Sequence, residues 1–210
     1  MTLVNVALTL STDELPSNIR EFISEANERV NDFMSARPKP LVGFFPSCFE
    51  MVYRALNEIS IRRLAPGNAF CEWGSGFGVT ASMASMLGFD AYGIEIDNEL
   101  CEVSRELAEQ FKLQVKFISG SFIPAGSDKI IERAYADFQG DMMLDPHSDA
   151  TYDEIGMEVS DFDLIFAYPW PKDAKLTSAI FNKFASSDAL LLTYNGRESM
   201  RLQRKLAYFN

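Results

Sequence analysis

An acidic residue followed by three alternating glycines is the part of this chain best suited to binding a ligand. Residues 70–78 read Phe-Cys-Glu-Trp-Gly-Ser-Gly-Phe-Gly, which places Glu72 two positions before Gly74, with Gly76 and Gly78 following. Glycine lets the main chain adopt positive φ angles and lets a ligand approach closely, because no Cβ stands in the way. The segment therefore predicts a sharp turn from a buried strand into a helix whose first backbone N–H groups face an anionic or electron-rich group.

A second acidic residue ends the next apparent strand. Residues 92–97 read Tyr-Gly-Ile-Glu-Ile-Asp, so Glu95 ends the apolar run directly and Asp97 lies just beyond it. A carboxylate has two acceptor oxygens and can bind both hydroxyls of a ribose. In doubly wound α/β folds, a glycine loop and a strand-final carboxylate hold a nucleoside-bearing ligand. We predict such a ligand here and prefer Glu95 to Asp97; the alternative for Glu95 is a solvated loop carboxylate.

Strands and helices alternate from residue 69 onward, and these elements must position the two acidic residues. Short apolar strands separated by helices are typical of a parallel sheet covered on both faces. We predict an α/β fold with a doubly wound, mostly parallel sheet and a shortened C-terminal end. The expected strands are 69–73, 90–95, 114–118, 162–167 and 188–194. The expected helices are 79–87, 98–111, 128–137 and 173–185, with room for one more helix near 197–207.

Two further helices are predicted before the first of these strands. Apolar residues within 15–34 trace one face of a helix, and Ser47 with Glu50 three residues later matches a capping box that opens a second helix. The first ten residues fit either a leading strand or a mobile tail. We divide the chain into an N-terminal helical extension, 1–46, that packs on the core, and a ligand-binding domain, 47–210.

Composition and charge narrow the class of protein. The 210 residues, 47% of them hydrophobic and 23% charged, are enough for one full hydrophobic core. No apolar stretch approaches the roughly 20 residues of a membrane span, so no membrane partner is expected. The formal net charge of -11 disfavours nucleic acid as a partner, and the basic residues within 197–205 are interpreted as a solvated helix face. Three widely spaced cysteines without a C-x-x-C pattern predict reduced thiols in the cytoplasm and no metal site.

The spacing of the glycines distinguishes two classes of nucleotide-binding loop. A dinucleotide fingerprint would need its third glycine at position 79, which is Val79, so a nicotinamide-dependent oxidoreductase is disfavoured. The observed pattern, Glu-x-Gly-x-Gly-x-Gly, resembles the first motif of class I S-adenosylmethionine-dependent methyltransferases. The run Gly-Ile-Glu-Ile-Asp at 93–97 is similar to the second motif of that family. The resemblance extends over about residues 47–195 and implies a Rossmann-like methyltransferase fold.

The same resemblance implies a cofactor and the residues that bind it. The cofactor is S-adenosyl-L-methionine, with the glycine loop lining its methionine moiety and Glu95 holding its ribose. The negative charge of Glu72 suits a ligand that bears positive charge and would repel a pyrophosphate. The implied cofactor-binding residues are Glu72, Gly74, Ser75, Gly76, Gly78, Glu95, Ile96, Ser121 and Phe122.

The end of the third strand departs from the family pattern. Many members have an aspartate after the glycine at this point, where it accepts a hydrogen bond from the adenine amino group, whereas this chain has Ser121 after Gly120. A hydroxyl accepts such a bond without the help of a full charge, so the adenine contact falls either to Ser121 or to the backbone. Phe122 either covers one face of the purine or packs in the core.

Aromatic residues follow the fourth strand. Residues 167–171 read Ala-Tyr-Pro-Trp-Pro, similar in position to the Asn/Asp/Ser-Pro-Pro-aromatic motif of amino-methyltransferases. Ala167 replaces the polar first residue, so adenine or cytosine methylation is not inferred. Tyr168 and Trp170 are the candidate catalytic residues, as an aromatic wall around a group that develops positive charge. The alternative is that both side chains cap the sheet by packing.

These features favour a methyltransferase that acts on an unidentified small molecule or protein. The alternative is a catalytically inactive module that binds an adenosyl ligand as a sensor or assembly subunit. The irregular stretch 138–160, which is long for a loop in a compact domain, is a candidate lid. Its single histidine, His147, is expected to be a surface residue.

Overall fold

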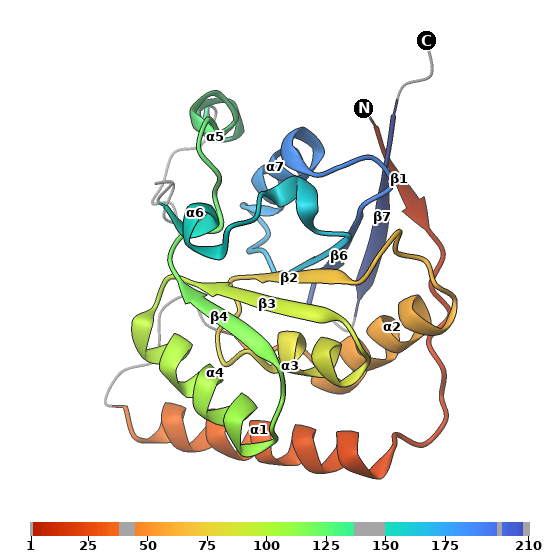
Figure 1. The fold of residues 1–210 in the computed structure, drawn as a ribbon, viewed down its shortest axis with the longest axis vertical. Helices are drawn as coiled ribbons and strands as arrows, with labels where there is room; N and C mark the ends of the chain where they lie inside the picture. The colour runs from red at the N-terminus through yellow and green to blue at the C-terminus, as the bar shows by residue number, and fades with distance from the viewer. Residues whose placement is uncertain (1, 38–44, 137–149, 197–198, 208–210) are drawn as a thin grey trace.

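The computed structural model describes residues 2–37, 45–136, 150–196 and 199–207, and these form one seven-stranded sheet with helices on both faces (Figure 1). The sheet order is β1-β7-β6-β5-β2-β3-β4. The strands are β1 Thr2–Val6, β2 Ala69–Trp73, β3 Asp90–Glu95, β4 Val115–Ser119, β5 Leu164–Ala167, β6 Leu190–Tyr194 and β7 Met200–Leu206. The helices are α1 Ser17–Ser35, α2 Phe49–Ile61, α3 Val79–Met86, α4 Asn98–Gln110, α5 Asp128–Tyr135, α6 Thr151–Ile155, the 3-10 helix η1 Val159–Asp161, and α7 Ala174–Phe184.

The sheet is mostly parallel, as the sequence predicts. Strands β2, β3, β4, β5 and β6 pair in parallel, while β7 pairs antiparallel with β6 on one side and with β1 on the other. The parallel strands end at one edge of the sheet, because Trp73 pairs with Ala167 and Glu95 pairs with Ser119. In such sheets ligands bind outside the carboxyl ends of the strands. A ligand site is therefore expected at this edge.

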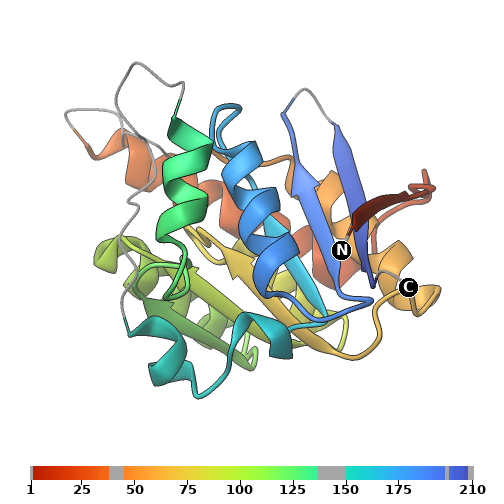
Figure 2. The same cartoon turned by 90° about the horizontal axis from the view of Figure 1, so that it is seen from above.

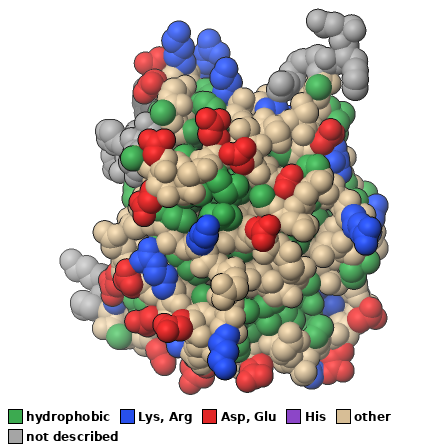
Figure 3. All heavy atoms as spheres, in the orientation of Figure 1, with side chains coloured by type: hydrophobic (Ala, Val, Ile, Leu, Met, Phe, Trp, Pro, Cys, Tyr) green, Lys and Arg blue, Asp and Glu red, His purple; other side chains and the backbone are tan. Residues whose placement is uncertain are grey.

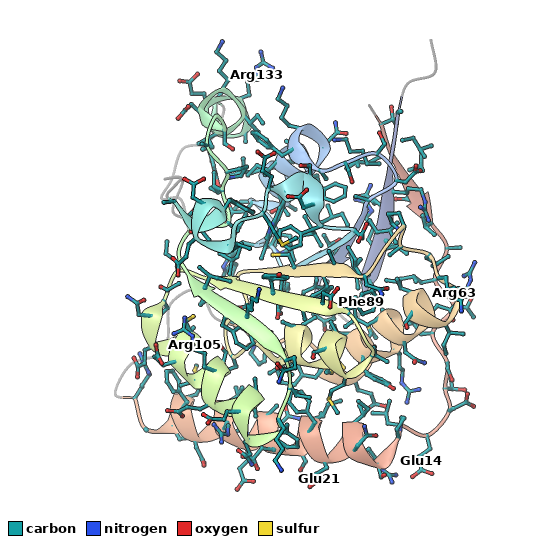
Figure 4. The ribbon with its side chains drawn as sticks, in the orientation of Figure 1. Glu14, Glu21, Arg63, Phe89, Arg105 and Arg133 are labelled. Atoms are coloured by element: carbon teal, nitrogen blue, oxygen red, sulfur yellow. The ribbon has the colours of Figure 1, made fainter. Side chains whose placement is uncertain are left out.

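The core has two halves, one on each face of the sheet. Successive residues of a strand point to opposite faces, so Phe70 packs in one buried cluster and Cys71 in the other. The layer of α1 to α4 covers one face and the layer of α5 to α7 covers the other (Figures 1 and 2). In the first layer Phe89, labelled in Figure 4, packs against Phe70 with ring centroids 6.1 Å apart. Continuous burial on both faces explains why these strands are almost wholly apolar.

The N-terminal segment contributes a strand and a helix to this architecture. Residues 2–6 pair with β7, so the leading-strand alternative is correct for them. Helix α1 buries Ile19 and Phe22 in the same cluster as the α2 side chains. The division of the chain at residue 46 stays a prediction.

The predicted helix near 197–207 is wrong, because residues 200–206 form strand β7. The segment pairs along its length with β6 and β1, and this tertiary pairing overrides its helix-forming residues. Its basic side chains are not a solvated helix face. Arg204 donates to the Leu64 carbonyl at 2.7 Å, and Lys205 is 1% exposed and donates to the Ala185 carbonyl.

The predicted capping box at the start of α2 is also wrong. Cys48 is the N-cap residue, and its side chain makes no capping hydrogen bond. Ser47 lies one position too early for that role, and the Glu50 carboxylate instead pairs with Arg54 one turn along the helix at 2.7 Å. Part of the candidate lid, 138–149 with His147, lies outside the described residues. No helix among the described residues is both long and apolar enough to cross a membrane.

Candidate active site

Three loops meet at the carboxyl edge of the sheet and are joined by backbone hydrogen bonds. The N–H groups of Gly74 and Ser75, in the loop after β2, both donate to the Ile94 carbonyl of β3 at 2.9 Å. The Gly120 N–H, after β4, donates to the Glu95 carbonyl at 2.9 Å. The glycine loop and the acidic strand end that the sequence singles out are therefore held side by side.

The Glu95 side chain points at the glycine loop. Its Oε2 accepts a hydrogen bond from the Gly76 N–H at 2.7 Å, and its Oε1 accepts one from the Asp97 N–H at 3.0 Å. Each carboxylate oxygen has a second acceptor position, so two further donors can bind. Asp97 has a different task, because its carboxylate caps helix α4 by accepting from the N–H groups of Glu99 and Leu100. The two acids therefore differ in their contacts, because Glu95 bonds to the glycine loop whereas Asp97 caps α4.

Glu72 is buried between the sheet and helix α3. Its Oε2 accepts from the Ala81 N–H at 2.8 Å, and the Thr80 side chain also bonds to it. Burial raises the pKa of Glu72 to about 8, although these two bonds oppose the rise. Burial likewise raises the pKa of Glu95, against the opposing bonds from Asp97 and Gly76. Two carboxyl groups with raised pKa values in one cleft are a mark of functional sites.

A cavity of about 330 Å³ opens between these groups, and its size falls in the range of small-molecule sites. The structure brings ten of the predicted site residues to its wall, and they come from the ends of β2, β3, β4 and β5. These ten are Glu72, Gly74, Ser75, Gly76, Glu95, Ile96, Ser121, Phe122, Tyr168 and Trp170. Their assignment to a cofactor or to catalysis stays a prediction.

Gly78 is the predicted site residue that does not line this cavity. It lies beneath the loop, where a Cβ would come within 2.4 Å of the Phe117 ring and 2.7 Å of the Ser104 Cβ. Its φ of 66° is also one that side-chain-bearing residues rarely adopt. Gly78 therefore serves close packing of the loop on β4 and α4, and its assignment to the cofactor stays a prediction.

We expect Gly78→Ala to destabilise the fold by about 1–2 kcal/mol more than Gly74→Ala. Both positions have left-handed backbone, with φ of 66° and 70°, so both variants carry that strain. Only the alanine at position 78 would overpack, because a Cβ at Gly74 meets no atom within 4 Å. Urea unfolding of the two variants measures the difference, and equal free energies of unfolding would contradict the packing role.

At one end of the cavity the residues after β3 and β4 form an apolar platform. Ile96 is 53% exposed, which is unusual for a large apolar side chain beside a buried carboxylate. The Phe122 ring stacks on the Trp73 ring, with 5.1 Å between the ring centroids and an interplanar angle of 11°. The Tyr152 hydroxyl donates a hydrogen bond to the Phe122 carbonyl at 2.7 Å. Phe122 thus both packs and lines the cavity. The Ser121 hydroxyl accepts from the Ile123 N–H at 3.2 Å.

At the other end, aromatic rings follow β5. Tyr168 makes an edge contact with Tyr194 at 4.8 Å between centroids, and Trp170 makes one with Phe45 at 5.2 Å. An adjoining cavity of about 260 Å³ is lined in part by Phe45, Tyr168, Trp170 and Asn195. Burial raises the pKa of Tyr168, and the neighbouring Tyr194 adds to the rise, so its hydroxyl stays protonated near neutral pH.

Sequence reasoning missed Trp73 and Asp173, which line the main cavity and carry buried polar atoms. Their Nε1 and Oδ2 atoms, like the Ser75 Oγ, are buried without a hydrogen-bond partner. Buried polar atoms are normally paired, so three unpaired atoms in residues that line one cavity fit a polar ligand. In the sequence, Trp73 has the pattern of a core residue of its strand, so it gave no sign of a role in the site. Asp173 directly precedes a helix, where aspartate is ordinarily a cap, so the sequence carried no separate signal for it.

Comparison with solved structures identifies the fold. An RNA methyltransferase from Salinibacter ruber, solved with S-adenosyl-L-homocysteine, matches at a TM-score of 0.52 and 17% identity, over 79% of this chain and 97% of that one. A methyltransferase from Geobacter sulfurreducens matches at 0.51 and 13%, over 91% and 99%. No protein-family model and no curated protein sequence matches this chain. The chain therefore has the Rossmann-like fold of class I methyltransferases, as the resemblance implies.

Proposed function

We propose that this protein is an S-adenosylmethionine-dependent methyltransferase. The observation that carries the proposal is the 2.7 Å hydrogen bond from the Gly76 N–H to Glu95, formed between two residues that line a cavity of about 330 Å³. An adenosyl ligand suits a glycine backbone without side chains that lies this close to a strand-final carboxylate. The cavity between them leaves room for such a ligand.

The residues present fit that cofactor along its length. When bound, it supplies a methyl group activated by a sulfonium. The free acceptor positions of Glu95 would bind the two ribose hydroxyls, and Ile96 and Phe122 would cover the adenine, whose amino group would bond to Ser121 or to the backbone. Glu72 and the backbone of Gly74–Gly76 would hold the methionine end. Glu72 in its charged form complements positive charge on the ligand.

Tyr168 and Trp170 would form the wall next to the reacting centre. Aromatic faces attract a group that carries or develops positive charge. The chain's main contribution to catalysis would be to position the acceptor and to exclude water. This role does not require a strong base if the acceptor arrives neutral.

We infer a small molecule or a protein as the acceptor, rather than nucleic acid. The formal net charge is -11, and acidic and basic side chains are interspersed over the face drawn in Figure 3. One structural neighbour is an RNA methyltransferase, but at 17% identity that likeness concerns the fold. The three free cysteines are consistent with a cytoplasmic location.

Two measurements on the purified protein test the proposal together. Calorimetric titration with S-adenosylhomocysteine should give saturable binding that NADH does not displace. Transfer of labelled methyl groups to amine, hydroxyl and carboxyl acceptors should give product with one class. Binding without product across all three classes would favour the inactive adenosyl-binding module, and displacement by NADH would refute the cofactor assignment.

We expect the pH dependence of ligand binding to depend on Glu72. Its pKa in the folded protein is about 8 rather than 4.5, so the free protein keeps a proton there that the unfolded chain has lost. Folding stability therefore falls as the pH rises from about 4.5 through about 8. A ligand with positive charge favours the carboxylate. The affinity of wild type relative to Glu72→Gln should therefore rise about tenfold between about pH 7 and pH 9.

Comparing the two proteins removes those effects of pH on binding that do not act through Glu72. The amide of Glu72→Gln can still accept from the Ala81 N–H, so the fold should persist. A constant ratio of affinities across this pH range would show that Glu72 does not face the cofactor's charge.

A further inference from the structure

Asp173 is the most unusual side chain in the main cavity. It is 1% exposed, and its two carboxylate oxygens differ in their surroundings. Oδ1 accepts a hydrogen bond from the Tyr135 hydroxyl of α5 at 2.6 Å, whereas Oδ2 has no hydrogen-bond partner. Leaving a carboxylate oxygen buried and unpaired is costly, so such an atom in a ligand cavity calls for a partner.

Helix capping does not explain why an aspartate occupies position 173. Asp173 occupies the N-cap position of α7, where aspartate normally accepts from the first backbone N–H groups, but its side chain makes no capping bond. Its backbone is fixed by other contacts. The Asp173 N–H donates to the Trp170 carbonyl at 2.8 Å, and the Asp173 carbonyl accepts from the N–H of Thr177 at 2.9 Å. The backbone of this turn is therefore hydrogen-bonded without the carboxylate, which makes no capping bond to the helix it precedes.

Helix α5, which carries Tyr135, holds one oxygen of the Asp173 carboxylate in place. Tyr135 lies on the part-buried side of α5, which packs against α7, whereas Arg133 of the same helix points outward (Figure 4). Burial, and then the bond to Asp173, raise the pKa of Tyr135, so its hydroxyl stays a donor. The bond to Oδ1 fixes the rotation of the carboxyl group and leaves Oδ2 as its available acceptor.

Position in the cavity separates Asp173 from the cofactor end. Glu72 and Glu95 lie at the glycine loop, while Asp173 shares the turn after β5 with the aromatic residues Tyr168 and Trp170. A ligand group between these rings and Oδ2 would meet aromatic faces and one anionic acceptor. That combination suits nitrogen with at least one N–H, and above all an amine.

We infer that Asp173 binds the methyl acceptor and that the acceptor is an amine carried on an apolar or aromatic group. This inference rests on the proposed methyl transfer. The lone pair of the neutral nitrogen forms the new N–C bond while the methyl–sulfur bond breaks with its electron pair on sulfur. The surplus proton passes from nitrogen to Asp173 Oδ2 and then to water. Tyr135 is a positioning residue for this carboxyl group.

The test uses 4-fluorobenzylamine as the amine probe and 4-fluorobenzyl alcohol as its neutral counterpart. Fluorine NMR titrations with the S-adenosylhomocysteine-loaded protein measure both dissociation constants without any turnover. The variants are Asp173→Asn, which keeps shape but loses the charge, and Tyr135→Phe. Asp128→Asn, an exposed carboxylate on α5 outside the cavity, is the matched control.

We expect Asp173→Asn to weaken amine binding at least tenfold, Tyr135→Phe to weaken it about threefold, and Asp128→Asn to behave as wild type. Alcohol binding and affinity for S-adenosylhomocysteine should stay unchanged in all three variants.

Equal amine binding by wild type and Asp173→Asn would overturn the inference. A selective loss of S-adenosylhomocysteine affinity would overturn it too, because Asp173 would then serve the cofactor. Failure of the wild type to bind S-adenosylhomocysteine would instead refute the proposed function. Melting temperatures of the variants check that each is folded.

Discussion

Gly76→Val should reduce the affinity for S-adenosylhomocysteine at least about 1,000-fold, which is roughly 4 kcal/mol. Two effects combine at this position. Gly76 lines the cavity, so a valine side chain would fill space that the ligand needs. Its φ of 52° is also one that β-branched residues hardly ever adopt, so the loop would shift and lose the bond from its N–H to Glu95. Calorimetric titration measures the change.

The matched control for this variant is Gly88→Val. Gly88 has a φ of 88° and is exposed just after α3, and a Cβ at this position would meet no atom within 4 Å. The control therefore carries the backbone strain without touching the cavity. Each valine should lower the free energy of unfolding by about 1–3 kcal/mol. Only Gly76→Val should lose binding. Unchanged affinity in a folded Gly76→Val protein would show that the ligand does not lie on this loop.

Glu95→Ala should weaken binding of the same ligand by about 1–3 kcal/mol, or roughly 5- to 150-fold. The variant removes both acceptor oxygens proposed for the ribose. It also frees the N–H groups of Gly76 and Asp97, which border the cavity and can bind water instead. Titration with S-adenosylhomocysteine and with adenine alone measures the change. The loss should be large for the nucleoside ligand and small for the base.

Asp90→Ala serves as the control, because Asp90 is an exposed acid at the opposite end of the same strand. It should leave the affinity unchanged. If Glu95→Ala lowers the melting temperature but binds S-adenosylhomocysteine as tightly as wild type, the carboxylate only holds the loop together.

Most of the sheet and the position of the cleft were predictable from local patterns. Buried parallel strands are short apolar runs, and both chemically informative segments lie where such runs end, so Glu72 and Glu95 could be placed from the residue pattern alone. Choosing Glu95 over Asp97 was also possible. A residue that ends a strand faces the cleft, whereas one just before a helix tends to cap it.

The errors and omissions concern contacts between segments far apart in the sequence. Strand β7 owes its conformation to β6 and β1, which no local pattern of its residues reveals. Gly78 and Gly93 look like loop and strand glycines, but in each case a Cβ would meet the Phe117 ring of β4. Asp173 gains its significance from Tyr135, which lies 38 residues earlier in the chain.

The central claim is that Glu95 and the glycine loop hold an adenosyl ligand between them. A crystal structure of the protein with S-adenosylhomocysteine tests it most directly. We expect both ribose hydroxyls within hydrogen-bond distance of the Glu95 carboxylate, and the ligand's amino-acid end over Gly74–Gly76. A ligand bound elsewhere, or a ribose with no contact to Glu95, would contradict the account.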